Sequence, residues 1–170
     1  MRLFIALHFD ESIKEVQDQI QKENAGFTFP KDFHLTLKFL GETDKVDEIK
    51  KKLSEIEIDP FEVELSEIGV FPSPQSVRVV WVGVKDGSKI LELQKKIEDS
   101  LLDFFPRDER FHPHVTLARV KFVKDKAKLK ENLGNVKVGE RKFKITDFYL
   151  YESKLTPDGP VYSVIDFRNL

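Results

Sequence analysis

Apolar residues recur along the chain in short blocks that predict β-strands, with helical segments between them. The blocks either alternate apolar and polar positions or consist of β-branched and aromatic residues, and breaks rich in Gly, Pro and Asp bound them. The predicted strands cover residues 3–9, 33–40, 61–71, 78–84, 114–120, 141–151 and 161–167.

Between these strands, apolar residues at intervals of three and four predict four amphipathic helices. They lie over residues 11–24, between Asp44 and Asp59, between Ser88 and Pro106, and over residues 125–133.

The order of the predicted elements repeats along the chain. At an offset of 80 residues, His-Leu-Thr-Leu at 34–37 falls on His-Val-Thr-Leu at 114–117, and the apolar pattern of 63–68 falls on that of 143–148. Because a solenoid needs at least about three repeats, two copies indicate a duplicated supersecondary unit.

This repeat predicts one domain over residues 1–170, with an internal repeat at roughly 2–73 and 78–153. We expect an α+β fold of two pseudo-symmetric lobes, each of mainly antiparallel sheet with flanking helices, and a cleft between the lobes. The strand-rich end of each half favours this fold over a doubly wound parallel sheet.

Composition and charge exclude several classes of protein. The chain has 170 residues, of which 40% are hydrophobic and 34% charged, and its formal net charge is −2. It contains no cysteine, which excludes disulfides, thiolate zinc sites, iron–sulfur clusters and cysteine nucleophiles. No apolar run approaches the roughly 20 residues of a membrane helix, and the N-terminal segment becomes acidic too soon for a signal peptide. We expect a cytoplasmic protein with no membrane partner.

Two of the four histidines, His34 and His114, begin the same tetrapeptide, His-x-Thr-Leu. In a chain of this composition a histidine is followed by x-Thr-Leu by chance only about one time in 300. Because residues i and i+2 of a strand share a face, Thr36 lies beside His34 and Thr116 beside His114. The apolar residues between them face the other side. Each strand is therefore predicted to present an imidazole and a hydroxyl to the cleft.

Two imidazoles on opposite sides of a cleft suit the metal-free cleavage of a phosphodiester. Since the unperturbed pKa of histidine is about 6.5, one ring can accept a proton from water while the other donates a proton to a leaving oxygen. Threonine hydroxyls can donate hydrogen bonds to the phosphate oxygens. The residues alone leave open which of His34 and His114 is the acid and which is the base.

The paired motifs FHLTLKFLG and PHVTLAR, with RLFIAL near the start of the chain, resemble the two-histidine (2H) phosphoesterase superfamily and its RNA 2',3'-cyclic phosphodiesterase (2'-5' RNA ligase-like) family. The resemblance covers essentially the whole chain. It implies metal-independent hydrolysis of RNA 2',3'-cyclic phosphate termini to 2'-phosphates, with reversible 2'-5' ligation in some members and no cofactor. By position, it implies His34 as proton donor, His114 as proton acceptor, Thr36 and Thr116 beside the phosphate, and Arg119 as a phosphate-binding residue.

Each predicted strand that carries a His-x-Thr-Leu motif also carries a cationic residue that is a candidate for substrate binding. In a regular strand Lys38 shares a face with His34 and Thr36, so Lys38 is a candidate phosphate contact. By the same rule Arg119 faces away from the cleft, unless a bulge turns it, it reaches round the end of the strand, or its role is structural.

The segment from Arg107 to Lys144 is basic, with 12 Lys and Arg against 5 Asp and Glu, a net charge of +7. Such a segment attracts phosphates without sequence choice, which favours RNA 3' ends as the partner. Lys126, Lys128 and Lys130 are equally well the solvated face of a helix. We expect no DNA partner, and the absence of a heptad pattern favours a monomer.

Other functions fit the same patterns. They are a non-catalytic RNA-binding module and a phosphodiesterase for a small cyclic nucleotide such as ADP-ribose 1'',2''-cyclic phosphate. A zinc-dependent hydrolase is a third, since His34, His112 and His114 supply three imidazoles. We expect His8 at the surface or core edge. The aromatic residues of 148–151 are expected in the core, although they suit stacking on a base.

Overall fold

Nine strands form two antiparallel sheets in the computed structural model, which describes residues 1–170. Every neighbouring strand pair is antiparallel. The first sheet has the strand order β3 (Phe33–Glu42), β1 (Arg2–Phe9), β8 (Asp147–Thr156) and β9 (Gly159–Asn169). The second has the order β2 (Ala25–Thr28), β6 (His114–Val123), β5 (Ser76–Lys85), β4 (Phe61–Ser73) and β7 (Lys142–Ile145). The predicted α+β fold is therefore confirmed.

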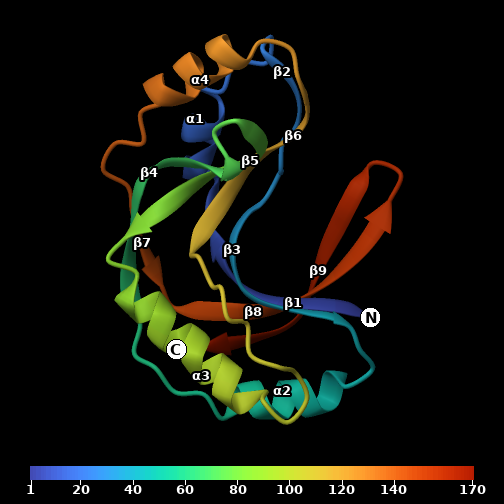
Figure 1. Cartoon of the computed structure of the whole chain (residues 1–170). Helices are drawn as coiled ribbons and strands as arrows, with labels where there is room; N and C mark the ends of the chain where they lie inside the picture. Colours follow the sequence, from blue (N-terminus) through green and yellow to red (C-terminus); the bar gives the residue numbers. More distant parts are fainter.

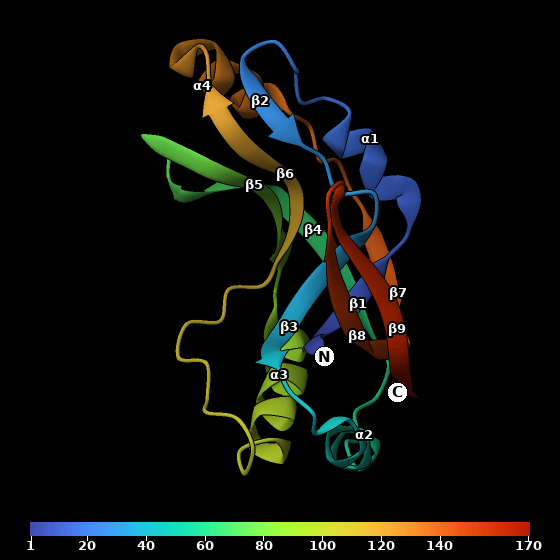
Figure 2. The ribbon, with the colours of Figure 1, turned by 90° about the vertical axis from the view of Figure 1, so that its right-hand side faces the viewer.

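Helices lie at the two ends of the sheets (Figure 1). At one end are α4 (Lys126–Asn135) and α1 (Lys14–Gln17), which follows a 3-10 turn at Glu11–Ile13. At the other end are α2 (Val46–Ser54) and α3 (Ser88–Ser100). The hairpin of β8 and β9 projects from one side, and the long loop between α3 and β6 projects from another (Figure 2). None of the helices has the length and apolarity that a bilayer crossing requires.

The last long strand of each half of the predicted repeat lies in the sheet of the other half. β1 and β3 pair with each other, and β1 then pairs with β8 from the end of the chain. In the same way β5 pairs with β6 and with β4 from the first half. The sequence predicted that each half forms its own lobe, whereas the first half supplies β2 and β4 to the second sheet, and the end of the chain supplies β8 and β9 to the first.

The helix predicted over residues 11–24 is shorter in the structure, because the chain leaves it after Gln17 and returns as β2 along the edge of β6. The buried Gln17 side-chain amide donates to the carbonyl oxygens of Pro30 and Leu117, at 3.0 and 2.9 Å. These bonds attach the end of the helix to the loop between β2 and β3 and to β6. The apolar positions that predicted a helix are buried as expected.

The strand predicted over residues 141–151 is divided at Thr146 into β7 and β8, which belong to different sheets. Ile145 pairs with Phe61 of β4 in the second sheet, whereas Asp147 pairs with β9 in the first. One continuous alternation of apolar and polar residues covers both pieces, so the pattern alone does not reveal the crossing.

Candidate active site

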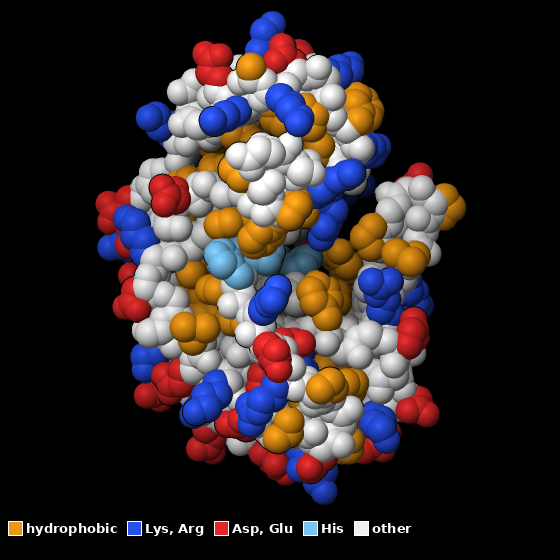
Figure 3. Space-filling model, in the orientation of Figure 1, with side chains coloured by type: hydrophobic (Ala, Val, Ile, Leu, Met, Phe, Trp, Pro, Cys, Tyr) orange, Lys and Arg blue, Asp and Glu red, His pale blue; other side chains and the backbone are white.

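β3 and β6 each present a histidine and a threonine to one cleft. The residues between them are fully buried in the core, so His34 and Thr36 on β3 and His114 and Thr116 on β6 face the other side. All four side chains line a cleft of about 1140 Å³. Figure 3 shows the histidine side chains gathered in the hollow at the middle of this face. The structure thus brings together the two motifs that lie 80 residues apart in the sequence.

A β-bulge interrupts β3 directly after its threonine. Thr36 lies opposite Ala6 of β1. The preceding residue of β1, Ile5, lies opposite Lys38, so Leu37 has no partner. Because side chains alternate with a period of two, one unpaired residue reverses the face of the residues that follow it.

β6 carries the same irregularity at the matched position. Thr116 lies opposite Trp81 of β5, and the preceding residue, Val80, lies opposite Ala118. Leu117 is therefore the unpaired residue. Ala118 is fully buried, so the residue after the bulge turns into the core.

Arg119, the next residue of β6, is exposed and lines the cleft. The sequence left open whether a bulge turns Arg119 toward the cleft, and the structure contains such a bulge. The guanidinium charge contributes to lowering the pKa of both His34 and His114, since it disfavours a second positive charge nearby. Arg119 thus brings a positive charge into the cleft that acts on both imidazoles.

Lys38 is turned the other way by the bulge in β3, and its side chain is only 1% exposed. Its Nζ lies 3.0 and 2.9 Å from the two carboxylate oxygens of Glu98, 3.0 Å from the carbonyl oxygen of Pro106 and 3.3 Å from a carboxylate oxygen of Asp108. Its donors are therefore engaged within the protein. Lys38 does line the cleft with His34, but its ammonium is held by these protein oxygens, which disfavours the predicted contact with phosphate.

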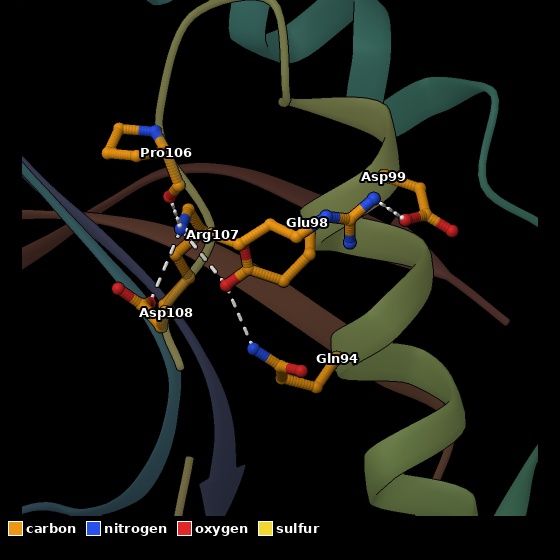
Figure 4. Close-up of polar contacts among 7 residues, drawn as sticks. Gln94, Glu98, Asp99, Pro106, Arg107 and Asp108 are labelled. Atoms are coloured by element: carbon orange, nitrogen blue, oxygen red, sulfur yellow. Dashed lines mark hydrogen bonds and ion pairs between the residues drawn. The ribbon is translucent and has the colours of Figure 1, made fainter. Parts of the chain in front are cut away.

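The Lys38 ammonium instead fixes the loop between α3 and β6 (Figure 4). The Gln94 side-chain amide donates to Glu98 at 2.9 Å and orients the carboxylate, while Arg107 pairs with Asp99 of α3. Residues 107–112 of this loop line the cleft. One buried cation of β3 thus positions a wall of the cleft.

The ring of His114 is oriented by its own backbone. Its Nδ1 lies 2.6 Å from the carbonyl oxygen of His112, so Nδ1 carries the proton and donates it, and Nε2 holds the lone pair in the neutral ring. The ring of Phe71 packs edge-on at 5.0 Å between centroids. Burial lowers the pKa of His114, and the bond to the His112 carbonyl partly opposes this shift.

His34 lies in a more apolar setting. The rings of Phe4 and Tyr162 approach it to 5.3 and 5.2 Å between centroids. Burial, followed by the charge of Arg119, lowers the pKa of His34 to about 4, and the carboxylate of Asp32 opposes the shift. Both imidazoles are therefore neutral at pH 7 in the free protein.

The other residues singled out in the sequence have different places. His8 is exposed and lies opposite His34 in the strand register, but it does not line the cleft. His112 does line the cleft. Phe148 belongs to the core, and the half-buried Tyr151 stacks on Phe4 at 5.1 Å between ring centroids. No three His, Asp or Glu side chains form a group that could hold a metal ion, so the imidazoles do not form the arrangement that the zinc alternative requires.

Sequence reasoning missed four aromatic residues that line the cleft, namely Phe4, Phe39, Phe111 and Tyr162. Phe39 follows the bulge in β3 and is 69% exposed, whereas a regular strand would bury it with Leu35. Phe4 lies in a continuous apolar block, so no alternation of apolar and polar residues indicates which side chains face the cleft. Only the strand order, which places β9 beside β8 and β8 beside β1, brings Tyr162 near it.

The fold is shared with solved structures. The crystal structure of TT0787 of Thermus thermophilus has a TM-score of 0.83 at 26% sequence identity, covering 100% of this chain and 98% of that one. E. coli LigT has the same fold, with a TM-score of 0.73 at 22% identity over 99% of this chain and 96% of LigT.

The sequence comparisons define the family. A family model described as the 2'-5' RNA ligase superfamily matches residues 7–156, and the chain belongs to that superfamily. A Methanocaldococcus jannaschii protein named RNA 2',3'-cyclic phosphodiesterase is 36% identical, covering 97% of this chain and 98% of its own length. A protein of the same name from Archaeoglobus fulgidus is 37% identical, with coverages of 95% and 96%. The family indicated by the paired motifs is therefore confirmed.

The structural role of Lys38 can be tested by stability measurements. Lys38→Met leaves the buried Glu98 carboxylate unpaired, and we expect the free energy of unfolding in urea to fall by about 3–5 kcal/mol. Lys51→Met, at an exposed position of α2, should change it by less than about 0.5 kcal/mol. Since replacing a whole buried pair by apolar residues costs much less, Lys38→Met with Glu98→Met should recover most of the loss. Equal stability of the Lys38→Met and Lys51→Met variants would contradict this role.

Proposed function

We propose that this phosphodiesterase hydrolyses RNA 2',3'-cyclic phosphate termini to 2'-phosphates, with His34 as general acid and His114 as general base. The observation that carries the proposal is the convergence of two imidazoles, from β3 and β6, on one cleft together with two threonines and Arg119. The name shared by the curated relatives supports the substrate. In the proposed reaction water attacks phosphorus, the bond from phosphorus to O3' breaks, and no metal takes part.

The hydrogen bond of His114 supports its role as the proton acceptor. Because Nδ1 donates to the His112 carbonyl, the Nε2 lone pair is free to take the proton of the attacking water. The same bond stabilises the imidazolium that forms, since the carbonyl oxygen lies beside the new positive charge. The low pKa of His114 keeps the ring neutral and ready as a base at pH 7.

His34 has to gain a proton before it can donate one to the leaving O3'. Its pKa of about 4 applies to the cleft without substrate, where burial and Arg119 disfavour the charged ring. A cyclic phosphate brings one negative charge between His34 and Arg119. That charge offsets the guanidinium and raises the pKa of His34, so substrate binding supplies the condition for protonation.

Thr36, Thr116 and Arg119 are proposed to hold the non-bridging phosphate oxygens. The hydroxyls and the guanidinium line the cleft and can donate hydrogen bonds to oxygens whose negative charge grows as water attacks. Ligation is the same displacement with an RNA 5'-hydroxyl in place of water, which would form a 2'-5' linkage when the bond to O3' breaks.

Substitution of either imidazole tests the acid–base pair. With an oligonucleotide ending in a 2',3'-cyclic phosphate, in the presence of EDTA, we expect kcat/KM of His34→Ala and of His114→Ala to fall by at least about 10²–10⁴-fold. His8→Ala is a matched control with nearly unchanged rate, since His8 lies outside the cleft. A variant at either position that keeps the full rate removes that residue from the mechanism, and loss of wild-type turnover in EDTA excludes a metal-free reaction.

The pH dependence tests the electrostatics of the cleft. Because kcat/KM reports the free enzyme and both pKa values are lowered, we expect a bell-shaped profile with both limbs below pH 6.5. Arg119→Met removes a positive charge that disfavours the imidazolium, so its profile should shift to higher pH as its KM rises. A flat wild-type profile, or one centred above pH 7, is incompatible with this pair.

A further inference from the structure

A second concave surface lies beside the cleft, between α4, the end of β6 and the β4–β5 hairpin. We call this surface the basic groove, and its volume is about 420 Å³. Its apolar floor consists mainly of valines and leucines from all three elements, and its charged residues are Arg78, Lys121, Lys126 and Lys130.

The charge of the basic groove has one sign. Four of its fourteen lining residues are cationic and none is acidic. None of the four forms an ion pair within the protein. In the upper part of Figure 3, Lys and Arg side chains border a patch of hydrophobic atoms. Such a surface complements a ligand that combines negative charge with flat apolar groups.

Two of the three lysines of α4 lie on the face of the helix that borders the groove. Lys126 and Lys130 are four residues apart, so they share a face of the helix, and both line the groove with Leu129 and Leu133. All three lysines are exposed, as the solvated-face alternative expects, and two of them also border the groove.

Phe122 gives the groove an aromatic platform. Its side chain is 54% exposed, and its ring lies so close to Gly26 of β2 that an added Cβ would clash with it. One face of the ring thus rests on backbone. The Nζ of Lys124 lies 5.9 Å from the ring centroid. Exposed aromatic rings among cations are how proteins bind single-stranded nucleic acid, because every base has a face that stacks.

The basic groove and the cleft are connected along one strand. Arg119 lines the cleft, and Lys121, two residues further along β6, lines the groove. Two residues of a strand span about 7 Å. A chain of phosphates whose end lies between the histidines can therefore continue along β6 into the groove.

We propose that the basic groove binds the nucleotides that precede the cyclic phosphate in a single-stranded RNA substrate. Lys and Arg side chains contact the phosphates, and Phe122 stacks on a base. The inference rests on the proposed function and extends it from the terminal phosphate to the body of the RNA.

The test compares a substrate that reaches the groove with one that does not. The two substrates are a ten-nucleotide single-stranded RNA ending in a 2',3'-cyclic phosphate, and adenosine 2',3'-cyclic phosphate. For the oligonucleotide we expect Phe122→Ala to raise KM about five- to a hundredfold, from the loss of stacking. Lys126→Glu with Lys130→Glu should raise KM and reduce the slope of log KM against log salt by about 1.4. For adenosine 2',3'-cyclic phosphate, kcat/KM should stay within about twofold.

A matched control separates local contacts from net charge. Lys51→Glu with Lys95→Glu makes the same change of charge at exposed positions of α2 and α3, at the opposite end of the molecule, and should leave the KM of the oligonucleotide nearly unchanged. The proposal is overturned if the groove variants match this control with the oligonucleotide, as expected of a docking surface for another protein. It is also overturned if the groove variants slow both substrates equally.

Failure of the proposed function would be visible separately. If the wild-type protein hydrolyses neither substrate, fluorescence anisotropy with a labelled ten-nucleotide RNA ending in a 2'-phosphate still measures the groove. Weaker binding by the Phe122→Ala and Lys126→Glu/Lys130→Glu variants than by the control supports the groove proposal, and equal binding by all proteins rejects it.

Discussion

Two β-bulges, at Leu37 of β3 and Leu117 of β6, determine which side chains enter the cleft and which enter the core. Upstream of each bulge a histidine and a threonine face outward. Downstream, the faces are reversed, so Arg119 enters the cleft while Lys38 is buried. The position of β3 that matches Arg119 is Phe39, so the cleft receives a guanidinium from one strand and an aromatic ring from the other. A nearly symmetric scaffold thereby gives its two imidazoles different surroundings.

The electrostatic balance of the cleft follows from this asymmetry. His34 lies among aromatic rings and within reach of the Arg119 charge, so its imidazole remains neutral until an anion arrives. His114 is held in one tautomer by a backbone carbonyl, so in the proposed mechanism it needs no anion to act as a base. The buried Lys38 supports this arrangement indirectly, because it binds Glu98 and the Pro106 carbonyl and so fixes the loop that forms one side of the cleft. The charges of the cleft are therefore arranged to receive an anion.

The sequence predicted the strands and helices that depend on local pattern. It did not predict the features that depend on which strands pair with each other. The strands carrying His34 and His114 were predicted because apolar alternation extends through both motifs, and this alternation also gave the correct faces up to each threonine. The side-chain direction of Lys38 was not predicted, because a bulge depends on how two strands pair and cannot be recognised from the sequence of one strand. Periodicity also could not predict that β4 and β8 each join the sheet of the other half, or that Tyr162 lies beside His34, because both depend on which strands pair.

The central claim is that the two imidazoles flank one phosphate and change their protonation around it. NMR titration of the histidine ring resonances, with and without a nucleoside 2'-phosphate, measures this directly. We expect His34 to titrate near pH 4 in the free protein and at clearly higher pH with the nucleotide bound, and the His114 ring to carry its proton on Nδ1. Ordinary titration of both rings near pH 6.5, unchanged by the nucleotide, would contradict the account.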